Sequence, residues 1–352
     1  MPKMQPSSFD SCRLPCDPGE LDEFLSRPTG AVIRTVARIG GPVLVLGAGG
    51  KIGLHLSLML RRAFDLAVKP NPVIAVSRFA TLRNREAFES RGVAARSCDL
   101  TNPADLASLP DSPTIFFLAG VKFGTAESPE KLRKINAEMP RLVAHRFPGS
   151  RIVAFSTGCV YPFVPIYSGG ATEGTPVAPV GDYAASCTAR EQAFIDASLN
   201  RGTATALVRL NYSVEFRYGL LVDIAEKVFR GEPVDVTTGY VNVIWQGDAV
   251  AHCIQALDLA AAPAVPINVT GAEVLSVRAI ALRFGELFDR PVQITGTEEQ
   301  TAWLNNASRS HALFGPPPTS LETMIQWIAA WLMSGGHTWG KPTGFENRDG
   351  RF

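Results

Sequence analysis

Short runs of β-branched and aliphatic residues alternate with helical patterns from Pro42 onward. This alternation at a steady interval is typical of a parallel sheet whose strands are connected by helices. The first five runs are almost entirely apolar, as expected for strands that helices cover on both faces. The chain is therefore predicted to adopt an α/β fold with a Rossmann-type doubly wound parallel sheet. The predicted strands span residues 43–46, 73–77, 93–97, 114–119, 151–155, 205–209 and 267–269.

Helical patterns fill the intervals between these strands. Apolar residues recur at helical spacing over 52–67, directly after the first strand. Residues 20–39 are also predicted to be helical, with an interruption at Arg27-Pro28. After Asn211 the alternation loosens. The elements predicted there are helices at 218–230, 277–288 and 321–331 and strand-like pieces at 234–236 and 292–295.

The change in pattern predicts a smaller C-terminal substrate lobe that is interleaved with the late elements of the sheet. The last residues are polar but hold Trp339, Phe345 and Phe352, so this tail either folds back, contacts a neighbouring subunit or stays disordered. The predicted parts are an N-terminal extension (1–40), a Rossmann domain (41–212, with 241–270 returning to it), a substrate lobe (213–240 and 271–335) and the tail (336–352).

The charge balance narrows the possible partners. The chain has 34 basic and 33 acidic side chains, a net charge of +1, which argues against a protein that neutralises nucleic-acid phosphates. No apolar run approaches the roughly 18 residues of a membrane span, and the N-terminus has no apolar signal segment. Of six cysteines only Cys12 and Cys16 are close together. We expect free thiols in a cytoplasmic protein and no metal site.

A glycine-rich stretch follows the first predicted strand. Gly47, Gly50 and Gly53 stand where a tight turn, a close approach of backbone to phosphate and close packing of helix on strand are needed. The N-terminus of the following helix adds partial positive charge. This strand-loop-helix context predicts a dinucleotide site.

The end of the second strand bears on the choice of cofactor. Ser77 and Arg78 stand where NAD-binding chains place an acidic residue for the ribose 2′-hydroxyl. Because these side chains can bind a 2′-phosphate that a carboxylate would repel, we favour NADP, with NAD possible. The preference stays open if Arg78 instead stacks on adenine or lies in solvent.

Together these segments resemble the extended short-chain dehydrogenase/reductase superfamily, specifically its NAD-dependent epimerase/dehydratase branch, which includes UDP-glucose 4-epimerase. The matching segments are GAGGKIG (47–53), CDL (98–100), LAGVK (118–122), STGCVY (156–161) and VIWQGD (243–248). The resemblance implies a homodimer and a hydride-transfer enzyme. The cofactor-binding residues it implies, with those of the glycine loop, are Gly47, Gly50, Lys51, Ile52, Gly53, Ser77, Arg78, Asp99, Leu100, Ala119, Lys122 and Asn136.

The resemblance also assigns the reacting centre and shows one departure from the family pattern. It places Thr157 as the hydroxyl that binds the reacting oxygen and Tyr183 as the residue that transfers its proton. The family's YxxxK lysine, which lowers the pKa of the tyrosine and holds the nicotinamide ribose, is Cys187 here. Cys187 is either a functional thiol or a small packing residue. Lys122 and Arg190 are possible substitutes for the lysine, although Arg190 could equally be a solvated helix charge.

The sequence offers four candidates for substrate contact: Asn211, Arg217, Trp245 and Gln246. All four follow strands or precede helices, and such residues often serve only capping or packing. We therefore expect a nicotinamide-dependent oxidoreductase or epimerase that acts on a small, sugar-like or other polyhydroxylated carbonyl substrate. The alternative is a non-catalytic NADP-binding sensor or scaffold that has lost the catalytic lysine.

Overall fold

The computed structural model describes residues 14–15, 17–79, 84–122 and 128–350, so the expectations for Cys12, Cys16 and Phe352 lie outside the described residues. Within them, seven parallel strands form one sheet in the order β12-β7-β5-β4-β1-β2-β3. The predicted α/β Rossmann-type fold is confirmed. The strands are β1 (Val43–Leu46), β2 (Val73–Ser77), β3 (Ala94–Ser97), β4 (Thr114–Phe117), β5 (Arg151–Thr157), β7 (Thr205–Leu210) and β12 (Val265–Val269).

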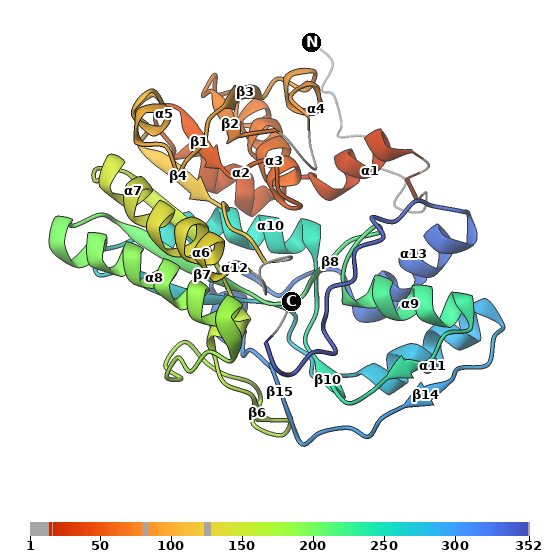
Figure 1. Ribbon diagram of the computed structural model, residues 1–352. Coiled ribbons are helices and arrows are strands. Elements are labelled where there is room, and N and C mark those ends of the chain that lie inside the picture. The colour runs from red at the N-terminus through yellow and green to blue at the C-terminus, as the bar shows by residue number, and fades with distance from the viewer. Residues whose placement is uncertain (1–13, 16, 80–83, 123–127, 351–352) are drawn as a thin grey trace, which may run out of the picture.

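Helices cover both faces of this sheet (Figure 1). Because side chains alternate along a strand, Val43 and Val45 of β1 pack into the core on one face, and Leu44 and Leu46 into the core on the other. The first face is covered by α2 (Gly30–Ala37), α3 (Gly53–Leu66) and α10 (Gln246–Gln255). The second face is covered by α5 (Pro103–Ala107), α7 (Met139–Arg146) and α8 (Gly181–Arg201).

The ends of several elements differ from the sequence pattern. The pattern ended the fifth strand at Phe155, because two polar residues follow it. In the structure β5 continues to Thr157, since Ser156 and Thr157 pair with Arg209 and Leu210 of β7.

The shorter elements are α4 (Glu86–Glu89), α6 (Pro129–Leu132), η1 (Arg133–Glu138), η2 (Gly158–Val160), β6 (Val164–Pro165), β8 (Ser213–Val214), β9 (Val234–Asp235), β10 (Tyr240–Val241), β11 (Ile244–Trp245), η3 (Ala256–Leu259), β13 (Leu275–Ser276), β14 (Ile294–Thr295), β15 (Thr301–Ala302) and α12 (Ser308–Phe314).

A separate hydrophobic core forms beside the sheet, around α9 (Leu220–Arg230), α11 (Val277–Phe288) and α13 (Leu321–Met333). These helices lie together on the right in Figure 1. The N-terminal helix α1 (Pro18–Leu25) adds Leu21 and Leu25 to this core. The predicted interruption at Arg27-Pro28 is confirmed, because α1 ends before it and α2 begins after it.

One buried carboxylate ties α1 to the rest of the chain. Asp22 is 5% exposed, and its oxygens lie 2.9 Å from Nε2 of His55, 3.2 Å from Nη1 of Arg91 and 3.4 Å from Nη2 of Arg217. Nδ1 of His55 lies 2.5 Å from the amide nitrogen of Gln246, which leaves Nε2–H to donate to Asp22. Thus α1 is joined to α3, to the chain after α4 and to the chain after β8.

We expect Asp22→Ala to lower the free energy of unfolding by about 3 kcal/mol, because removing one partner leaves buried charge without compensation. Guanidinium denaturation followed by circular dichroism measures this change. The matched control is Glu23→Ala on the exposed side of α1, which should stay within about 0.5 kcal/mol of the parent. Equal effects of the two substitutions would contradict the role given to Asp22.

Candidate functional site

The candidate site lies where neighbouring strands of the sheet end. Because the strands are parallel, β1, β4 and β5 deliver the loops that follow them to one edge. In the strand order, β2 and β3 lie on one side of β1, and β4 and the later strands lie on the other side. The order therefore reverses between β1 and β4, and α/β sheets bind ligands at such a switch point. The glycine loop, the segment from Leu118 to Lys122 and the segment after Thr157 therefore meet there.

The glycine loop has the tight packing that its sequence predicts. Gly47 has a φ of +87°, and a Cβ there would lie 2.4 Å from the backbone nitrogen of Ala119. A Cβ at Gly53 would lie 2.2 Å from the carbonyl oxygen of Ala48. The N-cap of α3, Ile52, makes no side-chain capping bond. The first N–H groups of this helix are therefore suited to bind an anion such as a dinucleotide pyrophosphate.

The residues predicted to face the adenosine side lie at the ends of β2 and β3. Ser77 is half-buried and Arg78 is exposed. The Asp99 carboxylate accepts hydrogen bonds from the backbone nitrogen of Thr101 at 2.9 Å and from its hydroxyl at 2.8 Å. The backbone hydrogen bond lowers the pKa of Asp99, and the charge of Arg78 contributes in the same direction. Leu100 is buried beside it.

Asn136 fixes the loop after β4 to helix α8. Its amide group donates to the carbonyl oxygen of Val121 at 2.8 Å and to Ser186 Oγ at 2.9 Å. Its Oδ1 accepts from Val121 N at 2.9 Å and from Arg190 Nη2 at 2.7 Å. Arg190 Nη1 also donates to the carbonyl oxygen of Phe155 at 3.2 Å. The alternative that Arg190 is a solvated helix charge is therefore wrong, because its face of α8 packs against the sheet.

The predicted reacting groups come from β5 and the start of α8. Thr157 Oγ1 accepts from the backbone nitrogen of Cys159 at 3.3 Å and caps η2. Tyr183 is in the first turn of α8, and its hydroxyl is within hydrogen-bonding reach of the Cys187 thiol. The Lys122 ammonium lies 5.7 Å from the centre of the Tyr183 ring. The structure therefore brings these three segments together.

Burial controls the protonation of this cluster. It raises the pKa of Tyr183 well above its ordinary value; the neighbouring Cys187 acts in the same direction, and the charge of Arg190 opposes it. Burial also raises the pKa of Cys187 and lowers that of Lys122. Tyr183 and Cys187 are thus protonated at neutral pH, as expected for groups in a low-dielectric site.

The candidates for substrate contact lie among other protein groups. The Asn211 amide donates to the carbonyl oxygen of Trp303 at 3.3 Å, and Arg217 is paired with Glu215 at 3.0 Å. All four side chains are buried. Trp245 packs edge-to-face against Phe24, Phe216 and Trp327, and Gln246 is the partner of His55. For Trp245 and Gln246 this geometry favours the packing alternative, and a substrate role for any of the four stays a prediction.

The C-terminal tail supplies neighbours that the sequence pattern did not identify. The rings of Trp339 and Tyr218 stack at 5.7 Å, and Phe345 is buried in the core around α9. Thr343 donates from its backbone nitrogen and hydroxyl to Asp223 at 2.8 and 2.6 Å. Of the alternatives for the tail, folding back over the protein is the one observed up to residue 350. In the sequence, the aromatic residues of the tail were the only indication that it folds back.

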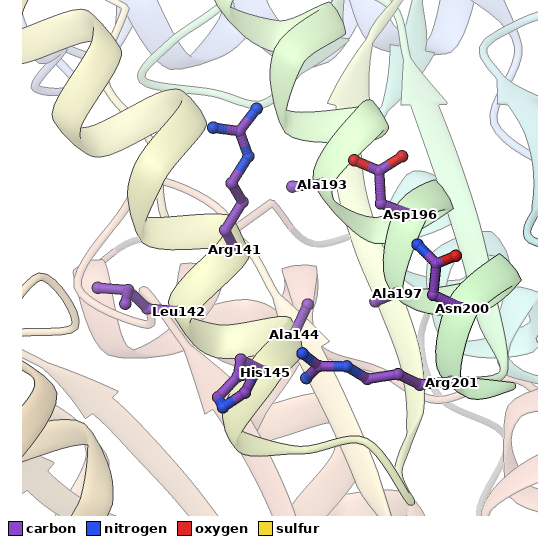
Figure 2. A pocket seen from close by; sticks show the side chains of 9 residues that line it. All are labelled: Arg141, Leu142, Ala144, His145, Ala193, Asp196, Ala197, Asn200 and Arg201. Atoms are coloured by element: carbon purple, nitrogen blue, oxygen red, sulfur yellow. The ribbon is translucent and has the colours of Figure 1, made fainter.

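A surface groove of about 370 Å³ lies between α7 and α8 (Figure 2), and Tyr183 is not among the residues that line it. Arg141 and His145 line it from α7, and Asp196 and Arg201 line it from the second half of α8. The groove is not part of the candidate site. The homodimer implied by the resemblance stays a prediction.

In the part of the chain that the structure describes, no helix is long and apolar enough to cross a membrane. Nor does any group of three or more His, Cys, Asp or Glu side chains there come together as a metal site. The free cysteines in that part are Cys98, Cys159, Cys187 and Cys253, and all are buried.

The profile of the NAD-dependent epimerase/dehydratase family matches residues 43–260, more than half of the chain. The chain belongs to this family. The solved Thermus thermophilus UDP-glucose 4-epimerase in complex with NAD is 21% identical, with a TM-score of 0.66 over 82% of this chain and 98% of that one. The dTDP-glucose 4,6-dehydratase of Bacillus anthracis in complex with NAD is 15% identical, with a TM-score of 0.71 over 84% of this chain and 97% of that one.

A third structure, MoeE5 in complex with UDP-glucose and NAD, is 17% identical, with a TM-score of 0.68 over 84% of this chain and 99% of that one. At these identities the likeness establishes the fold. No curated protein matches the chain. The Cys187 thiol carries no positive charge toward Tyr183, and the departure from the family pattern at this position stays a prediction.

We expect Cys187→Lys to lower the pKa of Tyr183, because an ammonium within reach of the phenol stabilises the phenolate. The measurement is a pH titration of phenolate absorbance, taken as the difference between each protein and the same protein with Tyr183→Phe. Cys187→Ala is the control, since it removes the thiol without adding charge. If the Lys and Ala variants titrate alike, this position does not control the Tyr183 proton.

Proposed function

We propose that this protein is a nicotinamide-dependent oxidoreductase or epimerase acting on a sugar-like or polyhydroxylated carbonyl substrate. The observation that carries the proposal is the approach of the Lys122 ammonium to the Tyr183 ring, at the edge of the sheet where β5 ends with Thr157 and the glycine loop follows β1. The family assignment and the named solved structures, which hold NAD and in one case UDP-glucose, support the reaction class. Substrate would lie between the sheet edge and the predicted substrate lobe, 213–240 and 271–335.

The residues present fit a dinucleotide. The glycine loop and the uncapped start of α3 would hold its pyrophosphate, and Asp99 would lie on the adenosine side. When bound, the nicotinamide supplies or accepts a hydride at the substrate carbon. Thr157 would donate a hydrogen bond to the reacting oxygen. Tyr183, protonated at neutral pH, would give its proton to that oxygen as the carbonyl is reduced.

The runner-up is a non-catalytic NADP-binding sensor or scaffold. Cys187 in the lysine position is the observation that favours it. The two functions differ in hydride exchange. A nicotinamide labelled with deuterium should lose its label to a substrate in an enzyme and keep it in a sensor.

We expect Tyr183→Phe to lower kcat by about 100-fold or more, because it removes the proton donor while keeping the ring. Turnover is measured with nicotinamide absorbance against a panel of sugars and nucleotide sugars. Tyr167→Phe is the control, since Tyr167 is 84% exposed. Unchanged turnover in Tyr183→Phe would rule out the role proposed for this residue.

NADP is the cofactor that we propose, with NAD possible, and Ser77 and Arg78 support it. We expect Arg78→Ala to raise the Kd for NADP by roughly tenfold and to leave the Kd for NAD nearly unchanged, because only NADP carries the 2′-phosphate. Isothermal titration calorimetry measures both constants. Arg201→Ala is the control, because Arg201 is exposed and lies at the far end of α8. Equal losses for both cofactors, or none for either, would contradict the preference.

A further inference from the structure

The last described residues connect two parts of the molecule that are far apart in the sequence. Phe345 is buried in the core around α9, α11 and α13, and this contact fixes the tail on that side. Beyond Phe345 the chain forms neither helix nor strand up to residue 350, the last one described. In Figure 1 the dark blue tail passes between α9 and α8. We call residues 346–350 the latch.

The latch crosses the start of α8 through a contact between two glycines. Gly350 has a φ of +73°, and Gly181 has a φ of +82°. A Cβ at Gly350 would lie 2.2 Å from the carbonyl oxygen of Val180, and a Cβ at Gly181 would lie 2.6 Å from the carbonyl oxygen of Gly350. Only glycine lets the two backbones come this close. Because α8 begins at Gly181, the crossing lies two residues before Tyr183.

One side chain holds the latch in place near this crossing. Arg348 donates from Nη1 to the carbonyl oxygen of Thr301 at 2.8 Å and from Nη2 to Thr301 Oγ1 at 2.8 Å. The Arg348 guanidinium also lies 4.3 Å from the centre of the Phe163 ring. Thr301 belongs to β15, which pairs with β6, so the latch is bonded to the chain that follows β5 and η2.

Beneath the latch is a small hydrophobic cluster that adjoins the candidate reacting groups. Its buried members are Cys159, Ala184 and Trp303, and Phe163 and Val180 pack against them. Cys159 lies two residues after Thr157, and Ala184 directly follows Tyr183. The latch contacts this cluster through Phe163 and Val180, and it therefore lies beside both segments that carry the reacting groups.

The composition of the latch suits a segment that opens by itself. Its sequence is ENRDG, without an apolar side chain, and Asn347 and Asp349 are exposed. Segments that bury little apolar surface open at a low cost in free energy, well below that of global unfolding. Phe345, which precedes the latch, is buried in a large core and stays in place when the latch opens.

We propose that the latch closes the candidate site on the side of α8, opens to admit substrate to Thr157 and Tyr183, and closes again to exclude water. The inference rests on the proposed function, because it takes these two residues as the reacting groups. It adds a conformational step to that function. It also assigns a role to a segment outside residues 43–260, which the family profile matches.

The rate at which Cys159 is labelled in the full-length protein measures this opening without cofactor or substrate. The reagents are iodoacetamide and fluorescein maleimide, which is larger than a monosaccharide, and peptide mass spectrometry resolves each cysteine. When a segment closes faster than a reagent reacts, the rate follows the population of the open form. Cys253, buried in α10 against the sheet, is the internal reference, because unfolding of that core would be needed to expose it.

We expect Gly350→Ala and Arg348→Ala to raise the labelling rate of Cys159 by roughly tenfold with both reagents, because each removes contacts of the closed latch. The rate at Cys253 should not change. Gly340→Ala is the matched control. Gly340 also has a positive φ, of +58°, but no described atom beyond its chain neighbours lies within 4 Å of a Cβ there. It adds similar backbone strain to the tail without a clash, and should leave Cys159 at the parent rate.

Three results would overturn the proposal. An unchanged rate at Cys159 would show that the latch does not cover the site. A rise with iodoacetamide alone would show an opening too small for a sugar. Equal rises at Cys159 and Cys253 would show that these residues support the whole fold. None of these measurements depends on turnover, which Tyr183→Phe tests, so the latch and the proposed function can fail separately.

Discussion

The parallel direction of the strands is the constraint on which the candidate site depends. It places the ends of β1, β4 and β5 at one edge of the sheet. The glycine loop and the segments that hold Lys122 and Thr157 therefore meet at this edge, although they are far apart in the sequence. Asn136 then joins the loop after β4 to α8 through both ends of its amide group, and α8 carries Tyr183. A single buried amide thus sets the distance between the strand ends and the proposed proton donor.

A second buried polar group connects this edge to the N-terminal helix. Asp22 contacts His55 in α3 and Arg217 after β8, and the Arg217 guanidinium lies 5.3 Å from the centre of the Trp339 ring. Trp339 in turn covers the Tyr218 ring beside Lys51. Helix α1 is therefore an integral part of the structure. Through Asp22 it supports the segment around Arg217 and Tyr218, over which the C-terminal tail lies.

The parts that sequence could predict are those governed by local pattern. Apolar runs located all the strands of the sheet, and the helix at Val277–Phe288 was predicted to the residue, because burial imposes a regular spacing. Helical spacing also predicted that Arg190 lies on the same face of the helix as Tyr183. Its burial could not be predicted, because it depends on contacts such as the hydrogen bond to Asn136, which is 54 positions away. The position of the C-terminal tail could not be predicted for the same reason, because Thr343 contacts Lys122 and Asp223, which are distant in sequence.

The balance of effects on Tyr183 bears on the direction of the proposed reaction. Arg190 lowers the pKa of the phenol, yet burial outweighs it and the net shift is strongly upward. The neighbouring Cys187 acts in the same direction as burial, so the site holds a proton at Tyr183 and stabilises phenolate poorly. Reduction of a carbonyl uses the protonated form, whereas oxidation of an alcohol needs the phenolate. An epimerase must use both forms in one cycle, whereas a reductase uses the protonated form alone.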